Sequence, residues 1–318
     1  MVLDRVAVIP SIGIGDGLIM MVVSHRLYCQ GFVVTTFSKP LIELQKWFQG
    51  HTFMERPPLD LLESTFAPFD LVILQNDNSP FSKKLISLYQ EGKLKALSIF
   101  YPSYEEAKHT SLSPIDRVFN ENRCMVDNAA RAISSLLGLN HFSKNNGFIL
   151  DESYTHRRYK NRVLFHPTSL DEKRNWPAQK FLHVATTLQN QGFQPVFILA
   201  PHERANWEPL LQNLFDMPLF PTLEELAAYA FESGYLIGND SGIGHLCSNL
   251  HIPTLIISNR KKYMRLWRPG WYRGDIATPP SWIPNFKGTR LRENKWKHWI
   301  STSQVLKKFH KLLDKEFS

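Results

Sequence analysis

The fold is decided near the N-terminus by residues 5–37, RVAVIPSIGIGDGLIMMVVSHRLYCQGFVVTTF. The apolar run 5–9 predicts a buried strand, and the glycine-rich run 11–17 predicts a turn. A helix is expected over 18–28, and a second strand follows over 32–37. Neighbouring strands that are joined through a helix run parallel, because a crossover is the connection that parallel strands need. The stretch therefore predicts an α/β fold that opens with a parallel sheet.

The same alternation of strands and helices continues along the rest of the chain. Polar residues 139–161 separate two such series and are expected to form a linker. We therefore expect two Rossmann-like doubly wound domains, 1–150 and 151–318. Such domains bind ligands at the carboxyl ends of their strands, so their functional residues should face a central cleft. Further strands are expected at 70–75, 96–100, 163–166, 195–200, 235–238 and 254–258, and further helices at 41–48, 82–89, 128–137, 177–190, 223–231, 243–250 and 303–315.

The composition is that of a globular protein without a membrane span. Of the 318 residues, 43% are hydrophobic, yet no apolar run approaches the ~20 residues that cross a bilayer. The first residues are typical of a strand and not of a signal peptide. The three scattered cysteines fit a reducing compartment and form no metal-ligand cluster. We therefore expect a cytoplasmic protein.

The net charge of +8 is concentrated in residues 255–318, the basic C-terminal segment, which holds 15 Lys and Arg but only 4 Asp and Glu. Such an excess favours an anionic partner: a nucleotide diphosphate, a phosphorylated acceptor or an acidic membrane. The segment has no known nucleic-acid-binding motif, so no nucleic-acid partner is expected. Tryptophan prefers the membrane interface, and cations alternate with rings over 295–299. These features suggest reversible contact with an anionic membrane through this segment, which contains Trp267, Trp271, Trp282, Trp296 and Trp299. The alternative is that some of these tryptophans close the core, which is reasonable for Trp267 but less so for Trp296 and Trp299, where cations and rings alternate.

The first motif is Gly13-Ile14-Gly15-Asp16-Gly17, after the first strand. It is not a dinucleotide fingerprint, because the third glycine of that pattern is replaced by Leu18. The second strand also ends without the acidic residue that would bind a ribose. Two interpretations remain. The glycines permit a tight turn that presents the Asp16 carboxylate to a cleft, or Asp16 only caps the helix.

The second motif is Asn239-Asp240-Ser241-Gly242-Ile243-Gly244-His245-Leu246, between a strand and a helix. A helix N-terminus with a serine and two flexible glycines can turn several backbone N–H groups toward an anion. The alternative is an ordinary N-cap with one buried histidine. Glycine in the first turn costs helix stability, so the sequence favours a pyrophosphate site.

The third motif is His166-Pro167-Thr168-Ser169, followed by the charged run 171–177, DEKRNWP. It follows the first strand of the second domain, where a cation could neutralise the charge that develops on a leaving phosphate. The alternative is a solvated loop with Pro177 at the start of a helix. No D-x-D, HExxH or GxxxxGK[ST] pattern occurs in the chain, so no metal site is predicted.

Together the three motifs resemble glycosyltransferase family 9, the lipopolysaccharide heptosyltransferase-like enzymes. That family has G-D after the first strand, a lysine before W-P, and D-[ST]-G-x-x-H before a helix. The resemblance implies a GT-B fold and a metal-independent, inverting transfer without a cofactor, from a nucleotide-sugar donor, with an ADP-sugar favoured. Asp16 would be the general base, and Lys173 would stabilise the leaving diphosphate. The donor pocket would be formed by Gly15, Thr168, Arg174, Asp240, Ser241, Gly242 and His245.

The chain departs from the family pattern in three places, one of which is the acceptor region 101–125, which does not resemble that of the heptosyltransferases that build the inner core. The family's first strand commonly ends in a basic residue, and here the position is Pro10. One extra residue before Trp176 leaves Lys173 and Arg174 competing for one role. Lys173 is preferred, because it follows the acidic pair 171–172 as the family's lysine follows its own acidic pair.

The resemblance also implies the partners. The N-terminal domain would carry a lipopolysaccharide or other glycolipid acceptor, and the C-terminal domain would carry the donor, with ADP-heptose among the candidates. The protein would be a bacterial cytoplasmic enzyme that associates peripherally with the inner face of the inner membrane. The alternative is a non-catalytic nucleotide-sugar-binding protein on the same fold. The presence of Asp16 argues against that alternative, because a binding protein has no need of a base.

Overall fold

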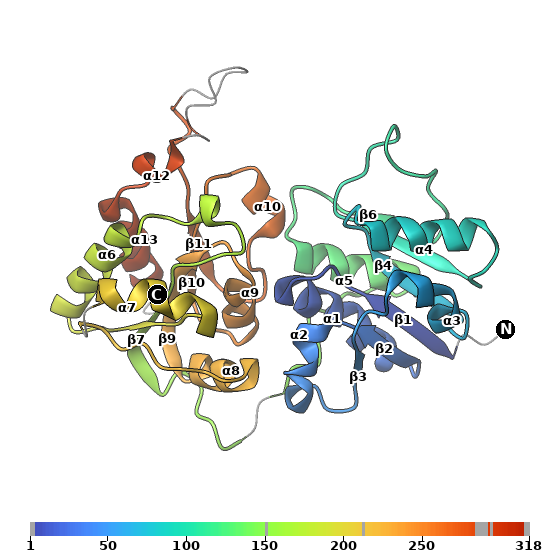
Figure 1. Cartoon of the computed structure of the whole chain (residues 1–318), viewed down its shortest axis with the longest axis horizontal. Helices are drawn as coiled ribbons and strands as arrows, with labels where there is room; N and C mark the ends of the chain where they lie inside the picture. Colours follow the sequence, from blue (N-terminus) through green and yellow to red (C-terminus); the bar gives the residue numbers. More distant parts are fainter. Residues whose placement is uncertain (1–3, 150–151, 212–213, 284–291, 293–294, 315–318) are drawn as a thin grey trace. The chain divides into compact units, whose positions relative to one another are not determined.

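The computed structural model describes residues 4–149, 152–211, 214–283, 292 and 295–314. The chain divides into two compact units, Met1–Leu150 and Asp151–Ser318 (Figure 1). Each unit is built on one parallel sheet, which gives the α/β class expected from the sequence.

The sheet of the first unit has the strand order β3-β2-β1-β4-β5-β6 in the described residues, and its neighbouring strands all run parallel. The chain therefore moves outward from β1 in one direction and then, from β4, in the other. The loops after β1 and β4 leave on opposite sides of the sheet at this switch point, where open α/β sheets form their ligand crevice. The strands are β1 (Arg5–Ile9), β2 (Val33–Phe37), β3 (Thr52–Met54), β4 (Leu71–Gln75), β5 (Leu97–Tyr101) and β6 (Arg117–Val118).

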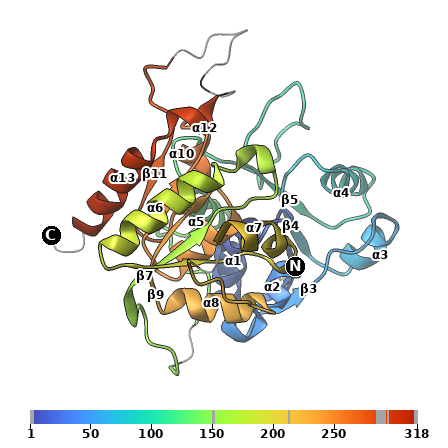
Figure 2. The same ribbon diagram turned by 60° about the vertical axis from the view of Figure 1, so that its left-hand side comes forward.

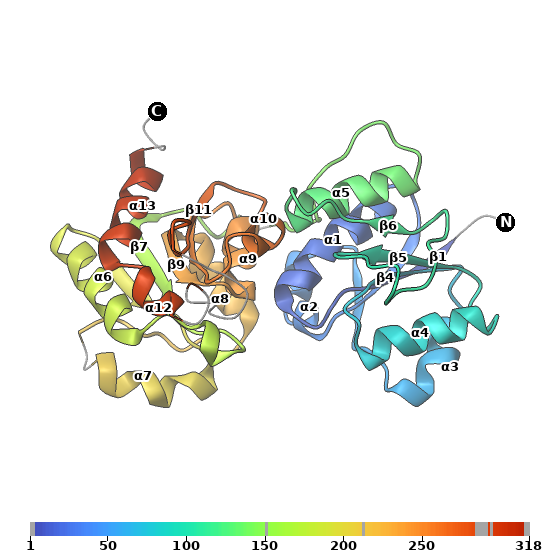
Figure 3. The same cartoon turned by 90° about the horizontal axis from the view of Figure 1, so that it is seen from above.

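Helices cover both faces of this sheet (Figure 3). α1 and α5 pack together on one face, and α3 and α4 lie on the other. There, Ile9 and Leu74 from the sheet share a core with Phe66 and Leu85 from the helices. The helices are α1 (Ile14–Tyr28), α2 (Lys39–Ile42), α3 (Leu62–Phe66), α4 (Pro80–Gln90) and α5 (Met125–Leu136), with short 3-10 turns η1 (Gln45–Trp47) and η2 (Leu59–Leu61).

The sheet of the second unit has the order β11-β10-β9-β7-β8 in the described residues, again with parallel neighbours. Its switch point lies between β7 and β9. The second and third sequence motifs follow these two strands, so the topology brings both motifs to the same edge of the sheet. The strands are β7 (Tyr159–His166), β8 (Gln194–Phe197), β9 (Ser233–Asn239), β10 (Thr254–Ile257) and β11 (Gly274–Ala277).

One face of this second sheet is covered by α6 and α13, which lie side by side (Figure 2). Phe181 of α6 and Phe309 of α13 pack there in one core with sheet residues. α9 contacts β9 and β10. The helices are α6 (Ala178–Asn190), α7 (Arg204–Leu211), α8 (Leu223–Phe231), α9 (Gly242–Asn249), α10 (Tyr263–Trp267), α12 (Trp296–Trp299) and α13 (Thr302–Asp314), with 3-10 turns η3 (Glu172–Arg174) and η4 (Pro201–Glu203).

Several predicted boundaries were wrong. The first helix begins at Ile14 and not at residue 18, so Asp16 lies inside its first turn. The helix predicted over 41–48 is instead split between α2 and η1. The expected linker includes residues 159–161, which belong to β7. The elements without a prediction are all short, where periodicity is weakest: β3, α3, β6, α7, α10, β11 and α12.

Candidate active site

The first site lies after β1, where three glycines open α1. Gly13 is the N-cap, with the ordinary φ of −72°, and neither it nor Gly17 has a positive φ. Neighbouring side chains leave little space for a Cβ at two of these glycines. A Cβ at Gly17 would stand 2.9 Å from the Oγ of Ser38, and one at Gly13 would stand 3.0 Å from Oδ2 of Asp16. The glycines at the start of α1 therefore serve close side-chain approach and not a special turn conformation.

Asp16 is the third residue of α1 and has a perturbed acidity. Its Oδ1 accepts a hydrogen bond of 2.6 Å from Nε2 of Gln75, the last residue of β4. Burial raises the pKa of Asp16 to about 6, against the lowering effect of the Gln75 bond. The N-cap residue Gly13 has no side chain, and the side chain of Asp16 bonds across the sheet edge to β4. This bond gives Asp16 a tertiary partner that a simple helix cap does not need.

A second carboxylate stands beside Asp16. Asp77 lies in the loop after β4 and accepts hydrogen bonds from the Oγ of Ser11 at 2.9 Å and the Oγ of Ser82 at 2.6 Å. The guanidinium of Arg56 lies 4.0 Å from Asp77 and donates to the carbonyl oxygen of Pro10. Asp77 raises the pKa of Asp16 and Arg56 lowers it. The guanidinium of Arg56 therefore lies at the end of β1, where the sequence has Pro10 in place of a basic residue.

In the second unit, Asn239 joins the two loops of the switch point. It is the last residue of β9 and is almost fully buried. Its Oδ1 accepts from the backbone N of Trp176 at 3.1 Å, and its Nδ2 donates to the carbonyl of Pro167 at 2.5 Å. One amide side chain thus holds the third motif against the strand that carries the second.

The two motifs meet directly in an ion pair. The guanidinium of Arg174 donates to the carboxylate of Asp240, and 35% of the Arg174 side chain and 12% of the Asp240 side chain are exposed. Burial raises the pKa of Asp240, while Arg174 acts in the opposite direction. Arg174 also lies 6.0 Å from the ring centroid of Tyr263 in α10. The pair places a cation beside the start of α9.

The N-terminus of α9 carries two polar side chains with unused bonding capacity. Ser241 is the N-cap but makes no side-chain cap bond, and within the described part of the chain its buried Oγ has no hydrogen-bond partner. The same holds for Nδ1 of His245. Burial lowers the pKa of His245 to about 4, so the ring is neutral at pH 7. Gly242 is the first residue of α9, and Gly244 packs closely against β10, because a Cβ there would stand 2.8 Å from Cδ1 of Ile256.

Two other predicted residues, Lys173 and Thr168, have side chains for which the structure gives no bond to the N-terminus of α9. Lys173 lies with Arg174 in η3, and its side chain is exposed. The hydroxyl of Thr168 donates to Oε2 of Glu203 at 3.0 Å. Glu203 also accepts from the backbone N of Ala200 at 2.9 Å. Thr168 therefore ties the loop after β7 to the loop after β8.

Gly15 is buried in the first turn of α1, beside Asp16. Gln75, Asp77 and Arg56 were not predicted as parts of the sites, and Asn239 was named in the second motif without a role of its own. A usable signal existed for three of them: Gln75 and Asp77 follow the apolar run 71–74, and Asn239 follows the run 235–237. Polar residues at the carboxyl end of a buried strand lie at the ligand edge of a parallel sheet. Arg56 has no such signal, because it reaches its partners from a loop 46 residues away from Pro10.

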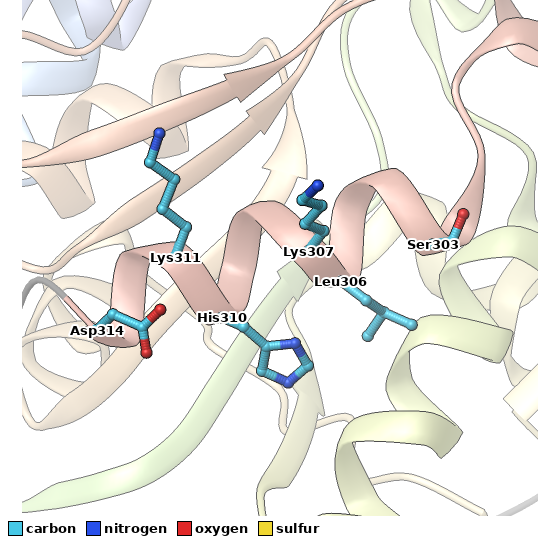
Figure 4. A pocket seen from close by; sticks show the side chains of 6 residues that line it. All are labelled: Ser303, Leu306, Lys307, His310, Lys311 and Asp314. Carbon is cyan, nitrogen blue, oxygen red and sulfur yellow. The ribbon is translucent and has the colours of Figure 1, made fainter.

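A surface pocket lies along α13, and none of the residues that line it belongs to the three motifs. Figure 4 shows Lys307 and Lys311 on one side of the helix and His310 on the other. His310 is within 2.9 Å of Oε1 of Gln191. The pocket is lined by residues of a single helix and takes no part in the site: Ser303, Leu306, Lys307, His310, Lys311 and Asp314.

The described ranges contain neither a metal-binding cluster nor a membrane-spanning helix. No three His, Cys, Asp or Glu side chains there are grouped so that they could hold a metal ion. Among the helices described, none has the length and apolar character to cross a membrane.

The tryptophans of the basic C-terminal segment have different environments. Trp296 is 3% exposed and packs in the core of the second unit, so its expected role in membrane contact was wrong. It shares this core with Phe181 of α6 and Phe309 of α13, which the alternation of cations and rings did not reveal. Trp282 is 75% exposed and Trp299 is 38% exposed, and their ring centroids lie 6.3 Å apart.

Comparison with known proteins identifies the family. The family model of glycosyltransferase family 9 (heptosyltransferase) matches residues 103–262, half of the chain. No match was found among curated proteins. Among solved structures, the chain resembles a family 9 glycosyl transferase from Veillonella parvula DSM 2008, with 18% identity, a TM-score of 0.66 and 99% of each chain covered.

Two Escherichia coli enzymes show the same fold. ADP-heptose lipopolysaccharide heptosyltransferase II is 15% identical, with a TM-score of 0.68 and 99% of this chain and 100% of that chain covered. Heptosyltransferase WaaC, solved with ADP, is 10% identical, with a TM-score of 0.66 and coverages of 97% and 99%. The α/β architecture with two parallel sheets matches these GT-B-type structures. The chain therefore belongs to glycosyltransferase family 9, the heptosyltransferase family, and is a glycosyltransferase.

Proposed function

We propose that this glycosyltransferase moves a sugar from an ADP-sugar to a hydroxyl of a lipopolysaccharide or other glycolipid acceptor, with inversion and without a metal ion. ADP-heptose is the first candidate donor. The observation that carries the proposal is Asp16, a carboxylate with a pKa of about 6 at the switch point of the first sheet. A non-catalytic binding protein has no use for such a group.

Asp16 would act as the general base. An inverting transfer needs a base that removes the proton of the acceptor hydroxyl as the new bond forms. A base works best when its pKa lies near the working pH, because it is then both ionised and a good proton acceptor. The pKa of about 6 meets this condition, whereas an ordinary aspartate at 3.8 is a much weaker base. The first unit, which carries Asp16, would bind the acceptor.

The second unit would bind the donor at the N-terminus of α9. Backbone N–H groups at Gly242, with the hydroxyl of Ser241, can meet a diphosphate there. The free Nδ1 of His245 adds a neutral hydrogen-bonding group beside them. These groups cost little to reorganise during the reaction, because the fold already holds them in place.

A fixed cation would stabilise the diphosphate as it leaves. The sequence favours Lys173, but Arg174 is the residue that already reaches Asp240, directly before Ser241. We assign the diphosphate contact to Arg174 and place Lys173, which is exposed in the same turn, as a second cation at the edge of the site. With these charges and a helix N-terminus, the chain can neutralise a diphosphate without a bound metal ion.

The protein would associate reversibly with the cytoplasmic face of an anionic membrane. Trp282 and Trp299 lie together on the surface of the basic C-terminal segment. Aromatic rings prefer the headgroup region, and each nearby lysine or arginine adds about 1 kcal/mol of attraction to an anionic leaflet. A peripheral position would bring the enzyme to a membrane-anchored acceptor.

A thermal-shift panel tests the donor assignment. ADP-, GDP-, UDP- and CMP-sugars are titrated separately against the purified chain. A ligand that binds only the folded state raises the unfolding temperature in proportion to the logarithm of its concentration. We expect a concentration-dependent shift with the ADP-sugar alone. A selective shift with another nucleotide would contradict the ADP assignment, and no shift with any of them would contradict the donor site.

A further inference from the structure

Gln75 occupies a position at which one side chain can control the orientation of another. It ends β4, is 1% exposed, and lies beside the end of β1, where Ile9 pairs with Leu74. Its Oε1 accepts a hydrogen bond of 3.1 Å from the backbone N of Ser11, and its Nε2 donates one of 2.6 Å to Oδ1 of Asp16. Both ends of the amide are therefore used.

The orientation of this amide follows from its partners. A backbone N–H can only donate, so the group that faces Ser11 must be the carbonyl oxygen of Gln75. The NH₂ group then faces Asp16, and a carboxylate is the acceptor it needs. A glutamine in this position cannot be flipped without placing two donors together at Ser11 and two acceptors together at Asp16.

The two oxygens of Asp16 consequently differ. Oδ1 is bound to Gln75, whereas Oδ2 lies beside Gly13, where a Cβ would be only 3.0 Å away. The missing side chain at Gly13 leaves the space next to Oδ2 clear. The charged groups that face the carboxylate are Asp77, from the loop after β4, and Arg56, from the segment after β3.

We propose that Gln75 is a positioning residue that binds Oδ1 of Asp16 and presents Oδ2 as the oxygen that takes the acceptor proton. This inference rests on the proposed role of Asp16 as general base. Gln75 touches no reacting atom and acts only through Asp16. Asp77 supports the arrangement from the other side, because it binds the hydroxyl of Ser11, whose backbone N is bound to Gln75.

The test replaces the donor of this hydrogen bond. Gln75→Met keeps the length of the side chain but loses the N–H group, and Gln75→Glu keeps an oxygen for Ser11 but brings a carboxyl group against Asp16. The matched control is Gln45→Met, because Gln45 also donates through its side chain, at 2.8 Å to the carbonyl of His51, and makes no hydrogen bond to Asp16 in the described part of the chain. Circular dichroism and thermal unfolding establish that each variant is folded.

The first readout is the pKa of Asp16, followed by the ¹³Cγ shift in protein labelled at aspartate and assigned with Asp16→Asn. We expect a value near 6 in the wild type and in Gln45→Met. It should rise by about one unit in Gln75→Met, because a bond to the charged form is lost. The rise should be larger in Gln75→Glu, because two adjacent carboxyls share one proton. If Gln75→Met does not fold, the pKa of Asp16 in Gln75→Glu alone tests the proposal.

The second readout is the pH dependence of turnover. In Gln75→Met, the acid limb of the profile should move to higher pH, and kcat should fall by roughly 10–100-fold, because a misplaced base loses its alignment with the acceptor. The KM for the donor should stay near the wild-type value. Unchanged Asp16 titration and an unchanged acid limb in both Gln75 variants would overturn the proposal. Wild-type turnover in Asp16→Asn would instead overturn the base assignment on which it rests.

Discussion

Arg174 and Asp240 form an ion pair across the switch point of the second sheet, from the loop after β7 to the loop after β9. The pair links the third and second motifs, which lie 66 residues apart in the chain. Removing one member of a buried pair leaves the other charge without compensation. The pair is partly exposed, so its loss should affect ligand binding more than folding.

Arg174→Ala should weaken ADP binding more than adenosine binding. A hydrogen bond to a charged group contributes about 1.5–3 kcal/mol, so the loss for ADP should be roughly 10–100-fold. Lys173→Ala should produce a smaller loss, because that side chain is exposed. Isothermal titration calorimetry of both variants with both ligands gives the comparison. Equal losses for ADP and adenosine would show that neither residue contacts the phosphates, and a larger loss in Lys173→Ala would restore Lys173 as the principal cation.

Asp16→Asn should lower turnover by roughly 10²–10⁴, the usual contribution of a general base. The amide keeps the size of the carboxyl and an oxygen for Gln75, so the fold and the donor affinity should be preserved. Steady-state kinetics with the donor and a lipopolysaccharide acceptor measures the loss, and calorimetry with ADP is the control. Turnover at the wild-type level would reduce Asp16 to a structural residue.

The stability of Asp16→Asn relative to the wild type should be greater at neutral pH than at acidic pH. The folded pKa of about 6 lies above the ordinary value of 3.8, so the folded state binds this proton more tightly than the unfolded state. The wild type therefore loses stability as pH rises from about 4 to 6, and the Asn variant does not. Thermal unfolding of both proteins from pH 4 to 8 gives the difference. A constant difference across this range would contradict the raised pKa.

Sugar transfer should survive EDTA. The proposed diphosphate site relies on Arg174, Lys173 and the N-terminus of α9, which chelation does not remove. Product formation is measured with EDTA-treated and with untreated enzyme, and then after addition of magnesium or manganese. Equal rates are expected throughout. Activity that disappears with EDTA and returns with either metal would overturn the metal-independent mechanism.

The protein should sediment with anionic vesicles at low salt but not with neutral ones. Binding should weaken as salt screens the charges. It should drop in the double variant Trp282→Ser/Trp299→Ser and in Lys295→Glu/Lys297→Glu. The matched control is Lys83→Glu/Lys84→Glu, which changes the net charge equally at two exposed lysines of α4 in the first unit. A wild-type protein that stays in the supernatant, or an equal loss in the control variant, would contradict a membrane role for the basic C-terminal segment.

Much of the fold is local in origin and could therefore be predicted. The run 5–37 alternates between strand and helix patterns strongly enough to specify β1, α1 and β2 in the correct order. α8 matches its predicted range, 223–231, because the side-chain oxygen of Thr222 caps it by accepting a hydrogen bond from the backbone N–H of Glu225. The glycines of the first motif predicted a turn, so the start of α1 was placed too late in the chain. The space that these glycines leave is taken by residues distant in the chain, such as Ser38.

The sequence by itself determined the α/β class and the family motifs, and it marked Asp16, Arg174 and Asp240 as candidate site residues, because each stands in a local pattern of strand, turn and helix. Only the tertiary structure decided what these residues meet. The order of the strands places β4 beside β1 and β9 beside β7, and so brings Gln75 to Asp16 and Asp240 to Arg174. The acidity of Asp16 depends on this placement, because burial and a neighbour 59 residues away set the energy of its charge, and neither is written in the residues around it.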